Sequence, residues 1–109
     1  MNKTVLFVAL LSATSVRADD ALPRYDVAAL CTAASGALGN SAFARSACQD
    51  QEQESYDRLK QRWAGLPDEV RTTCQKVSSW TGPGSYFVLG ACVDVELEAR
   101  SRAATSFRY

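Results

Sequence analysis

The sequence contains no histidine, and this absence removes several kinds of chemistry at once. A Ser-His or Cys-His nucleophile needs an imidazole base, so neither can be built from this chain. The four cysteines include no C-x-x-C pair, which disfavours a structural zinc site. The apolar run at residues 5–11 is far shorter than the roughly 20 residues that a membrane-spanning helix needs. We therefore predict no metal, no cofactor and no enzymatic activity.

The first 18 residues have the features of a secretory signal peptide. Lys3 precedes the apolar run, and small residues end at Ala18, just before two aspartates. This order predicts cleavage after Ala18 and a periplasmic or secreted protein, with a retained membrane anchor as the alternative. Cleavage would remove Lys3 and Arg17, which lowers Lys plus Arg from 12 to 10 against 12 Asp plus Glu, a net charge of −2. We expect such a chain to bind neither nucleic acid nor an anionic membrane, and to make no membrane insertion after cleavage.

The remaining residues, 19–109, are expected to form a single small domain with a limited core. All four cysteines lie in this part, and their even number predicts two disulfides in an oxidising compartment. Each bridge typically contributes about 2–4 kcal/mol, which is comparable to the whole stability margin of a small domain.

One short frame, Cys-x-Asp-x-Glu-x-Glu, begins at Cys48 and again at Cys92. Aligning the two copies superimposes Ser41 on Ser85 and Phe43 on Phe87, and further upstream Cys31 meets Cys74 once a one-residue difference in length between the copies is allowed. This agreement predicts an internal duplication, with repeat units near residues 27–55 and 70–99. Chance is the alternative, since Ala, Ser and Gly align easily.

Each repeat unit is interpreted as a helical hairpin. In the second copy "CVDVELE" alternates like a strand, but its counterpart "CQDQEQE" has no apolar face and continues into a helical stripe of Tyr56, Leu59, Trp63 and Leu66. We predict an all-α four-helix bundle of two disulfide-stapled hairpins, with helices near 26–35, 41–64, 67–79 and 85–102 and a frayed tail at 103–109.

Several residues should start or separate these helices. Asp26, Ser41 and Ser85 are predicted N-caps. Pro67 is predicted in the first turn of its helix, and Gly39-Asn40 should supply left-handed backbone between helices.

The acids of the repeated frame are interpreted as a solvated helix surface: Asp50, Glu52, Glu54, Asp94, Glu96 and Glu98. Ion pairs at i,i+4 spacing are predicted for Glu54–Arg58, Glu96–Arg100 and Glu98–Arg102. The alternatives are a catalytic role or a calcium site, although calcium takes six to eight oxygens that a straight helix face does not supply.

Hairpin geometry also bears on the cysteine pairing. Cys31 and Cys48 should lie at similar heights on neighbouring helices, offset by about 4–5 Å, and so should Cys74 and Cys92. We favour these two pairs, and the crossed set of Cys31–Cys92 with Cys48–Cys74 stays open.

Three stretches carry a resemblance: "RYDVAALC", "YDRLKQRWAGLP" followed by "RTTC", and "GPGSYFVLGACVDVE". Together they resemble an uncharacterised family of short exported four-cysteine proteins from alphaproteobacteria, across most of residues 24–98. The resemblance implies export and a disulfide-stapled helical fold. It implies no activity and no catalytic residue.

Two other features have a functional and a structural interpretation. The loop "GPGS" before the last helix could hold an anion on backbone N–H groups, but a turn with a helix cap is favoured. Trp63 and Trp80 could form a ligand cage, but core packing is favoured. We expect a non-enzymatic exported module that binds a protein or small ligand or supports the envelope. The alternative is a small periplasmic hydrolase or thiol-redox enzyme that uses surface carboxylates or cysteines.

Overall fold

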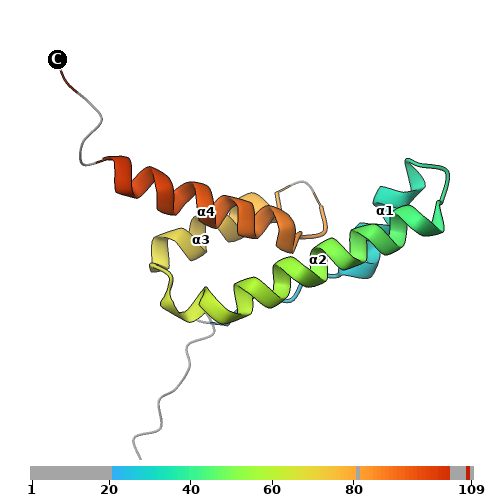
Figure 1. The fold of residues 1–109 in the computed structure, drawn as a ribbon, viewed down its shortest axis with the longest axis horizontal. Coiled ribbons are helices and arrows are strands. Elements are labelled where there is room, and N and C mark those ends of the chain that lie inside the picture. The colour runs from blue at the N-terminus through green and yellow to red at the C-terminus, as the bar shows by residue number, and fades with distance from the viewer. Residues whose placement is uncertain (1–20, 81, 104–107, 109) are drawn as a thin grey trace, which may run out of the picture.

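The fold is all-helical in the part of the chain that the computed structural model describes, residues 21–80, 82–103 and 108 (Figure 1). The elements are α1 (Val27–Gly36), α2 (Ala42–Arg62), the 3₁₀ turn η2 (Trp63–Gly65), α3 (Asp68–Ser78) and α4 (Tyr86–Ala103). The predicted all-α bundle is confirmed, and the helices begin and end close to the predicted positions. The predicted signal peptide and most of the predicted frayed tail lie outside the described residues.

The predicted helix caps are confirmed. The side chains of Asp26, Ser41 and Ser85 accept hydrogen bonds from the backbone N–H groups three residues later, at 3.0, 3.2 and 3.2 Å. Pro67 lies one position earlier than predicted, at the N-cap of α3 rather than in its first turn. Gly39 and Asn40 take the left-handed backbone expected of them, with φ of 72° and 58°.

Each helical hairpin is closed by its own disulfide. The first staple, Cys31–Cys48, joins α1 to α2, and the second staple, Cys74–Cys92, joins α3 to α4. The Cα atoms are 5.5 Å apart in both. The favoured pairing is therefore confirmed and the crossed pairing is wrong.

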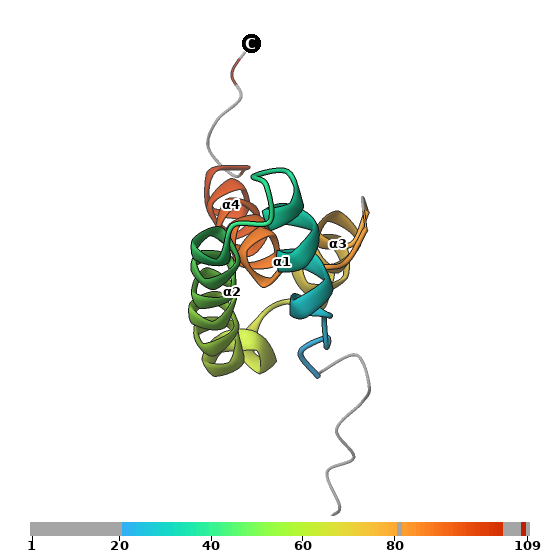
Figure 2. The same ribbon diagram turned by 90° about the vertical axis from the view of Figure 1, so that its right-hand side faces the viewer.

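The hydrophobic core lies between the second half of α2, η2, α3 and α4. Its buried members are Leu59, Trp63, Leu66, Val70, Cys74, Tyr86, Leu89 and Val93. Helix α1 supplies none of them and instead packs along the first half of α2, so that the first hairpin projects beyond the other two helices (Figures 1 and 2). We call residues 27–49 the stapled arm. Among the described residues, no helix is long and apolar enough to cross a membrane.

The two tryptophans have different environments. Trp63 is buried as predicted, but Trp80 is 84% exposed, so its assignment to the core is wrong. Helix α3 ends at Ser78, and Trp80 follows that last turn instead of continuing the buried face of the helix. The predicted helical stripe is confirmed: Leu59 of α2, Trp63 of η2 and Leu66 just after η2 are buried, and Tyr56 is half-buried.

Two of the three predicted ion pairs are present. Arg58 binds Glu54 at 3.2 Å, and Arg102 binds Glu98. The predicted Glu96–Arg100 pair is wrong, because Arg100 reaches across to Glu69 on α3. A second link between helices joins Arg62 of α2 to Asp94 of α4 at 2.7 Å.

Candidate functional site

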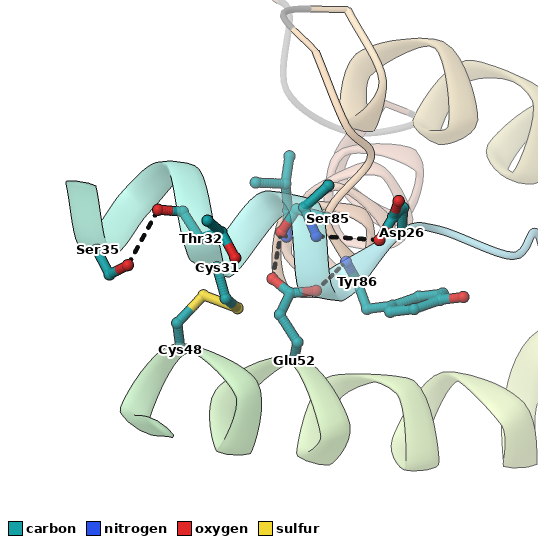
Figure 3. The surroundings of a disulfide bond; sticks show 10 residues. Asp26, Cys31, Thr32, Ser35, Cys48, Glu52, Ser85 and Tyr86 are labelled. Atoms are coloured by element: carbon teal, nitrogen blue, oxygen red, sulfur yellow. Dashed lines mark hydrogen bonds between the residues drawn. A yellow bond between two sulfur atoms is a disulfide. The ribbon is translucent and has the colours of Figure 1, made fainter. Parts of the chain in front are cut away.

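The acids of the repeated frame do not form one solvated surface. Asp50, Glu54, Asp94 and Glu98 are exposed, and Glu96 is half-buried. Glu52 is only 4% exposed, so its assignment to a solvated face is wrong. It lies on α2 beside the first residues of α4, and its side chain points toward them (Figure 3).

Both carboxylate oxygens of Glu52 accept hydrogen bonds from the start of α4. Ser85 Oγ donates to Oε1 and the Tyr86 backbone N–H donates to Oε2, each at 2.6 Å (Figure 3). Ser85 also accepts from the Val88 N–H, so the carboxylate and the hydroxyl cap the helix together. A carboxylate is stabilised at this position by the positive end of the helix dipole and by charge-assisted hydrogen bonds.

This arrangement answers the question raised by the "GPGS" loop. The N-terminus after that loop does hold an anion, but the anion is the protein's own Glu52. Since Glu52 occupies the Tyr86 N–H group and the Ser85 hydroxyl, the turn-and-cap interpretation is the correct one here.

Three tyrosine rings gather next to Glu52. The ring of Tyr86 lies 4.8 Å from that of Tyr25 and 4.9 Å from that of Tyr56, measured between centroids. The Tyr86 hydroxyl donates to the Pro23 carbonyl at 2.8 Å and accepts from the Tyr25 N–H at 2.9 Å. These contacts fix the segment before α1 against the start of α4, and such tilted or edge-on ring pairs are favourable in themselves.

Tyr25 is held on its other side by α3 and by the loop before α4. Its hydroxyl shares a hydrogen bond with Ser78 Oγ. Burial raises the pKa of Tyr25 above 10.0, the hydrogen bond from Ser78 opposes this, and nearby Tyr86 adds to it. A Cβ on Gly84 would lie 2.2 Å from the Tyr25 ring, so only glycine allows this close approach.

An open cleft of about 470 Å³ lies over this cluster, between the arm and the core. Its lining consists of Arg24, Tyr25, Val27, Ala28, Gln49, Glu52, Gln53, Tyr56 and Tyr86. Arg24 is exposed and has no ion-pair partner among the described residues. The cleft therefore offers aromatic surface, the amides of Gln49 and Gln53 and the exposed cation of Arg24, although Gln53 Nε2 already donates to Asp57 at 2.9 Å. The carboxylate in its lining, Glu52, is bonded to the start of α4.

The sequence-predicted candidates are dispersed. In the described part of the chain, no three Cys, Asp or Glu side chains are grouped as metal ligands would be. The four cysteines are all in disulfides, with Cys31 and Cys74 completely buried. Trp80 is exposed and Trp63 is buried in the core, so the two tryptophans do not form a ligand cage.

Sequence reasoning missed the residues that form the cleft. Tyr25 and Tyr86 are 61 positions apart and meet only in the folded chain. Both lie in stretches that carry the family resemblance, "RYD" and "GPGSY", which was the one available signal. Comparison of this chain with protein-family models, with curated proteins and with solved structures finds no match.

Proposed function

We propose that this protein is a non-enzymatic, exported binding module whose ligand occupies the tyrosine cleft. The observation that carries the proposal is the cleft itself, with its three rings, two glutamines and the exposed Arg24 around Glu52, whose two oxygens already accept hydrogen bonds within the protein. Its volume of about 470 Å³ falls within the range of about 300–1,000 Å³ typical of small-molecule sites. Export to the periplasm and membership of the exported four-cysteine family belong to the same proposal.

The occupied carboxylate favours binding over catalysis. A general base must reach the proton that it abstracts, and both oxygens of Glu52 already accept short hydrogen bonds. A thiol-redox role needs an exposed cysteine of low pKa, whereas each disulfide has one completely buried sulfur partner, Cys31 or Cys74. Both considerations weigh against the hydrolase and redox alternatives.

The lining indicates which ligands to try. Tyrosine rings offer flat apolar surface with a polar edge, and the glutamine amides and Arg24 donate hydrogen bonds to acceptor oxygens. A small ligand with a flat or apolar face and a carboxylate or several hydroxyls matches this set. Aromatic amino acids, amino sugars and dipeptides with an aromatic residue represent three such classes.

Ligand-observed NMR with these three sets of probes tests the proposal. We expect at least one set to bind with a millimolar or better dissociation constant, and Gln49→Ala and Arg24→Ala each to weaken binding about tenfold. Gln51→Ala is the matched control, because Gln51 is on the same helix but lines a different hollow. No binding by any probe, or equal losses in the Gln49 and Gln51 variants, would contradict a ligand site in this cleft.

A further inference from the structure

The stapled arm differs from the rest of the molecule in its charge. The chain as a whole is 22% charged, yet residues 27–49 contain a single ionisable side chain outside the disulfide, Arg45. Arg45 is exposed and has no ion-pair partner among the described residues. The arm is therefore a neutral surface with one available positive charge and no carboxylate.

The end of the arm is apolar and open to solvent. Leu38, in the turn after α1, is 68% exposed, and Phe43, in the first turn of α2, is 82% exposed. They border a hollow of about 660 Å³ whose other lining residues are uncharged: Ser41, Ala44, Ala47, Cys48 and Gln51. Leu38 and Phe43 line the same hollow, so they form one apolar surface and are not singly scattered residues, and a shared apolar surface of this kind is a candidate for interaction.

The first staple keeps this surface in place. Cys31 and Cys48 join the two helices of the arm, and the turn between them is shaped by the left-handed pair Gly39-Asn40. The turn lies at the end of the arm farthest from α3 and α4 (Figure 1). Since the disulfide constrains the backbone of the hairpin, its end loses little backbone freedom on binding, which favours association.

Charge decides between the possible occupants. If two copies met end to end, their Arg45 side chains would be brought together without a carboxylate from either arm to pair with them. Anionic lipid phosphates would instead provide the missing negative charge. Asp50, the first acid after the arm, is about 10 Å from Phe43 along α2 at 1.5 Å per residue, which exceeds the Debye length of about 8 Å in physiological salt.

We propose that the stapled arm docks on an anionic lipid surface. Leu38 and Phe43 enter the boundary between headgroups and acyl chains, and Arg45 lies at the phosphates. This is a peripheral contact and not a membrane span. The net charge of −2 expected after cleavage at Ala18 averages over the molecule, whereas the arm itself contains no Asp or Glu. The overall charge therefore does not describe the surface that docks.

Vesicle flotation tests the proposal with protein purified from the periplasm of an expressing bacterium, all variants having the same N-terminus by intact mass. We expect binding to vesicles of phosphatidylglycerol and phosphatidylethanolamine, and weaker binding to phosphatidylcholine. Leu38→Ser with Phe43→Ser should weaken the partition at least about tenfold. Val77→Ser with Val95→Ser removes two exposed apolar residues from α3 and α4 and should leave it unchanged.

Two further variants separate the parts of the proposal. Arg45→Gln should abolish the preference for phosphatidylglycerol. Phe43→Trp in a Trp80→Phe background should give a blue-shifted emission on vesicles that the Trp80→Phe parent lacks, while the fold, checked by circular dichroism, is intact. Equal flotation of the wild type and the Leu38/Phe43 variant would overturn the proposal. So would an absence of flotation, and a dimer in sedimentation velocity that depends on these two residues would then identify the end of the arm as a self-association surface.

Discussion

Replacement of Glu52 is the sharpest perturbation that the structure offers. Glu52→Ala removes both hydrogen bonds to the start of α4 and the negative charge at that helix N-terminus. Glu96→Ala is the matched control, because Glu96 has the same position in the repeated frame and makes no side-chain hydrogen bond or ion pair in the described part of the chain.

The expected loss in the free energy of unfolding follows from the two hydrogen bonds that Glu52 accepts. Hydrogen bonds to charged groups contribute about 1.5–3 kcal/mol each, so their loss spans about 3–6 kcal/mol. Glu52 lines the open cleft, and water can therefore replace part of what is lost at the Tyr86 N–H. We expect Glu52→Ala to lower the free energy of unfolding by about 3 kcal/mol, a large share of the about 5–15 kcal/mol typical of small domains.

Glu52→Gln keeps the shape and one acceptor oxygen but loses the charge, so we expect an intermediate cost of about 1–2 kcal/mol. Glu96→Ala should stay within about 0.5 kcal/mol of the wild type. Urea unfolding followed by circular dichroism measures all three variants. If Glu52→Ala costs no more than Glu96→Ala, the carboxylate does not stabilise the start of α4 and our account of the site is wrong.

Three further predictions concern the staples, the tyrosine and the glycines. Cys31→Ala with Cys48→Ala should cost about 2–4 kcal/mol and remove hydrogen-exchange protection mainly from α1, which contacts the core cluster only through the partly buried Val27; equal loss in α3 and α4 would contradict this. Burial raises the pKa of Tyr25 above 10.0, so at alkaline pH the folded state keeps a proton that the unfolded state releases. The contribution of this residue to the free energy of unfolding is therefore complete below about pH 10 and is lost as pH rises through the folded pKa. Tyr25→Phe should flatten this alkaline decline of stability in urea titrations, and an unchanged decline would refute the prediction. Gly84→Ala should cost about 1–3 kcal/mol through the clash with the Tyr25 ring, whereas Gly90→Ala, which meets no atom closer than 3.9 Å, should be neutral or stabilising in thermal unfolding.

Local features were predictable because each depends on few neighbouring residues. A cap such as Ser41 needs only the N–H group three residues later, and the stripe through Leu59 and Trp63 needs only the helical period. The pairing of Cys31 with Cys48 was also accessible, because both lie in one hairpin whose turn limits their offset.

The candidate site was not predictable on these terms. Tyr25 and Tyr86 are in contact although they are 61 positions apart in the chain. Arg100 forms its ion pair with Glu69 on α3 and not with Glu96, which is one turn away on the same helix. Which partner a side chain binds in these cases depends on how the helices pack. Residues that are far apart in the chain become possible partners only after the fold has brought them together.

Glu52 and Glu96 have the same predicted local structure but different surroundings in the folded protein. From the sequence alone, both glutamates are predicted on helices, in the same position of a repeated frame after a stapling cysteine, and both helices are present. The packing of the helices places the start of α4 beside Glu52, whereas no helix N-terminus among the described residues donates to Glu96. The physical reason is that a buried carboxylate requires donors, and here the donors are a hydroxyl and an N–H group more than thirty residues away in the chain.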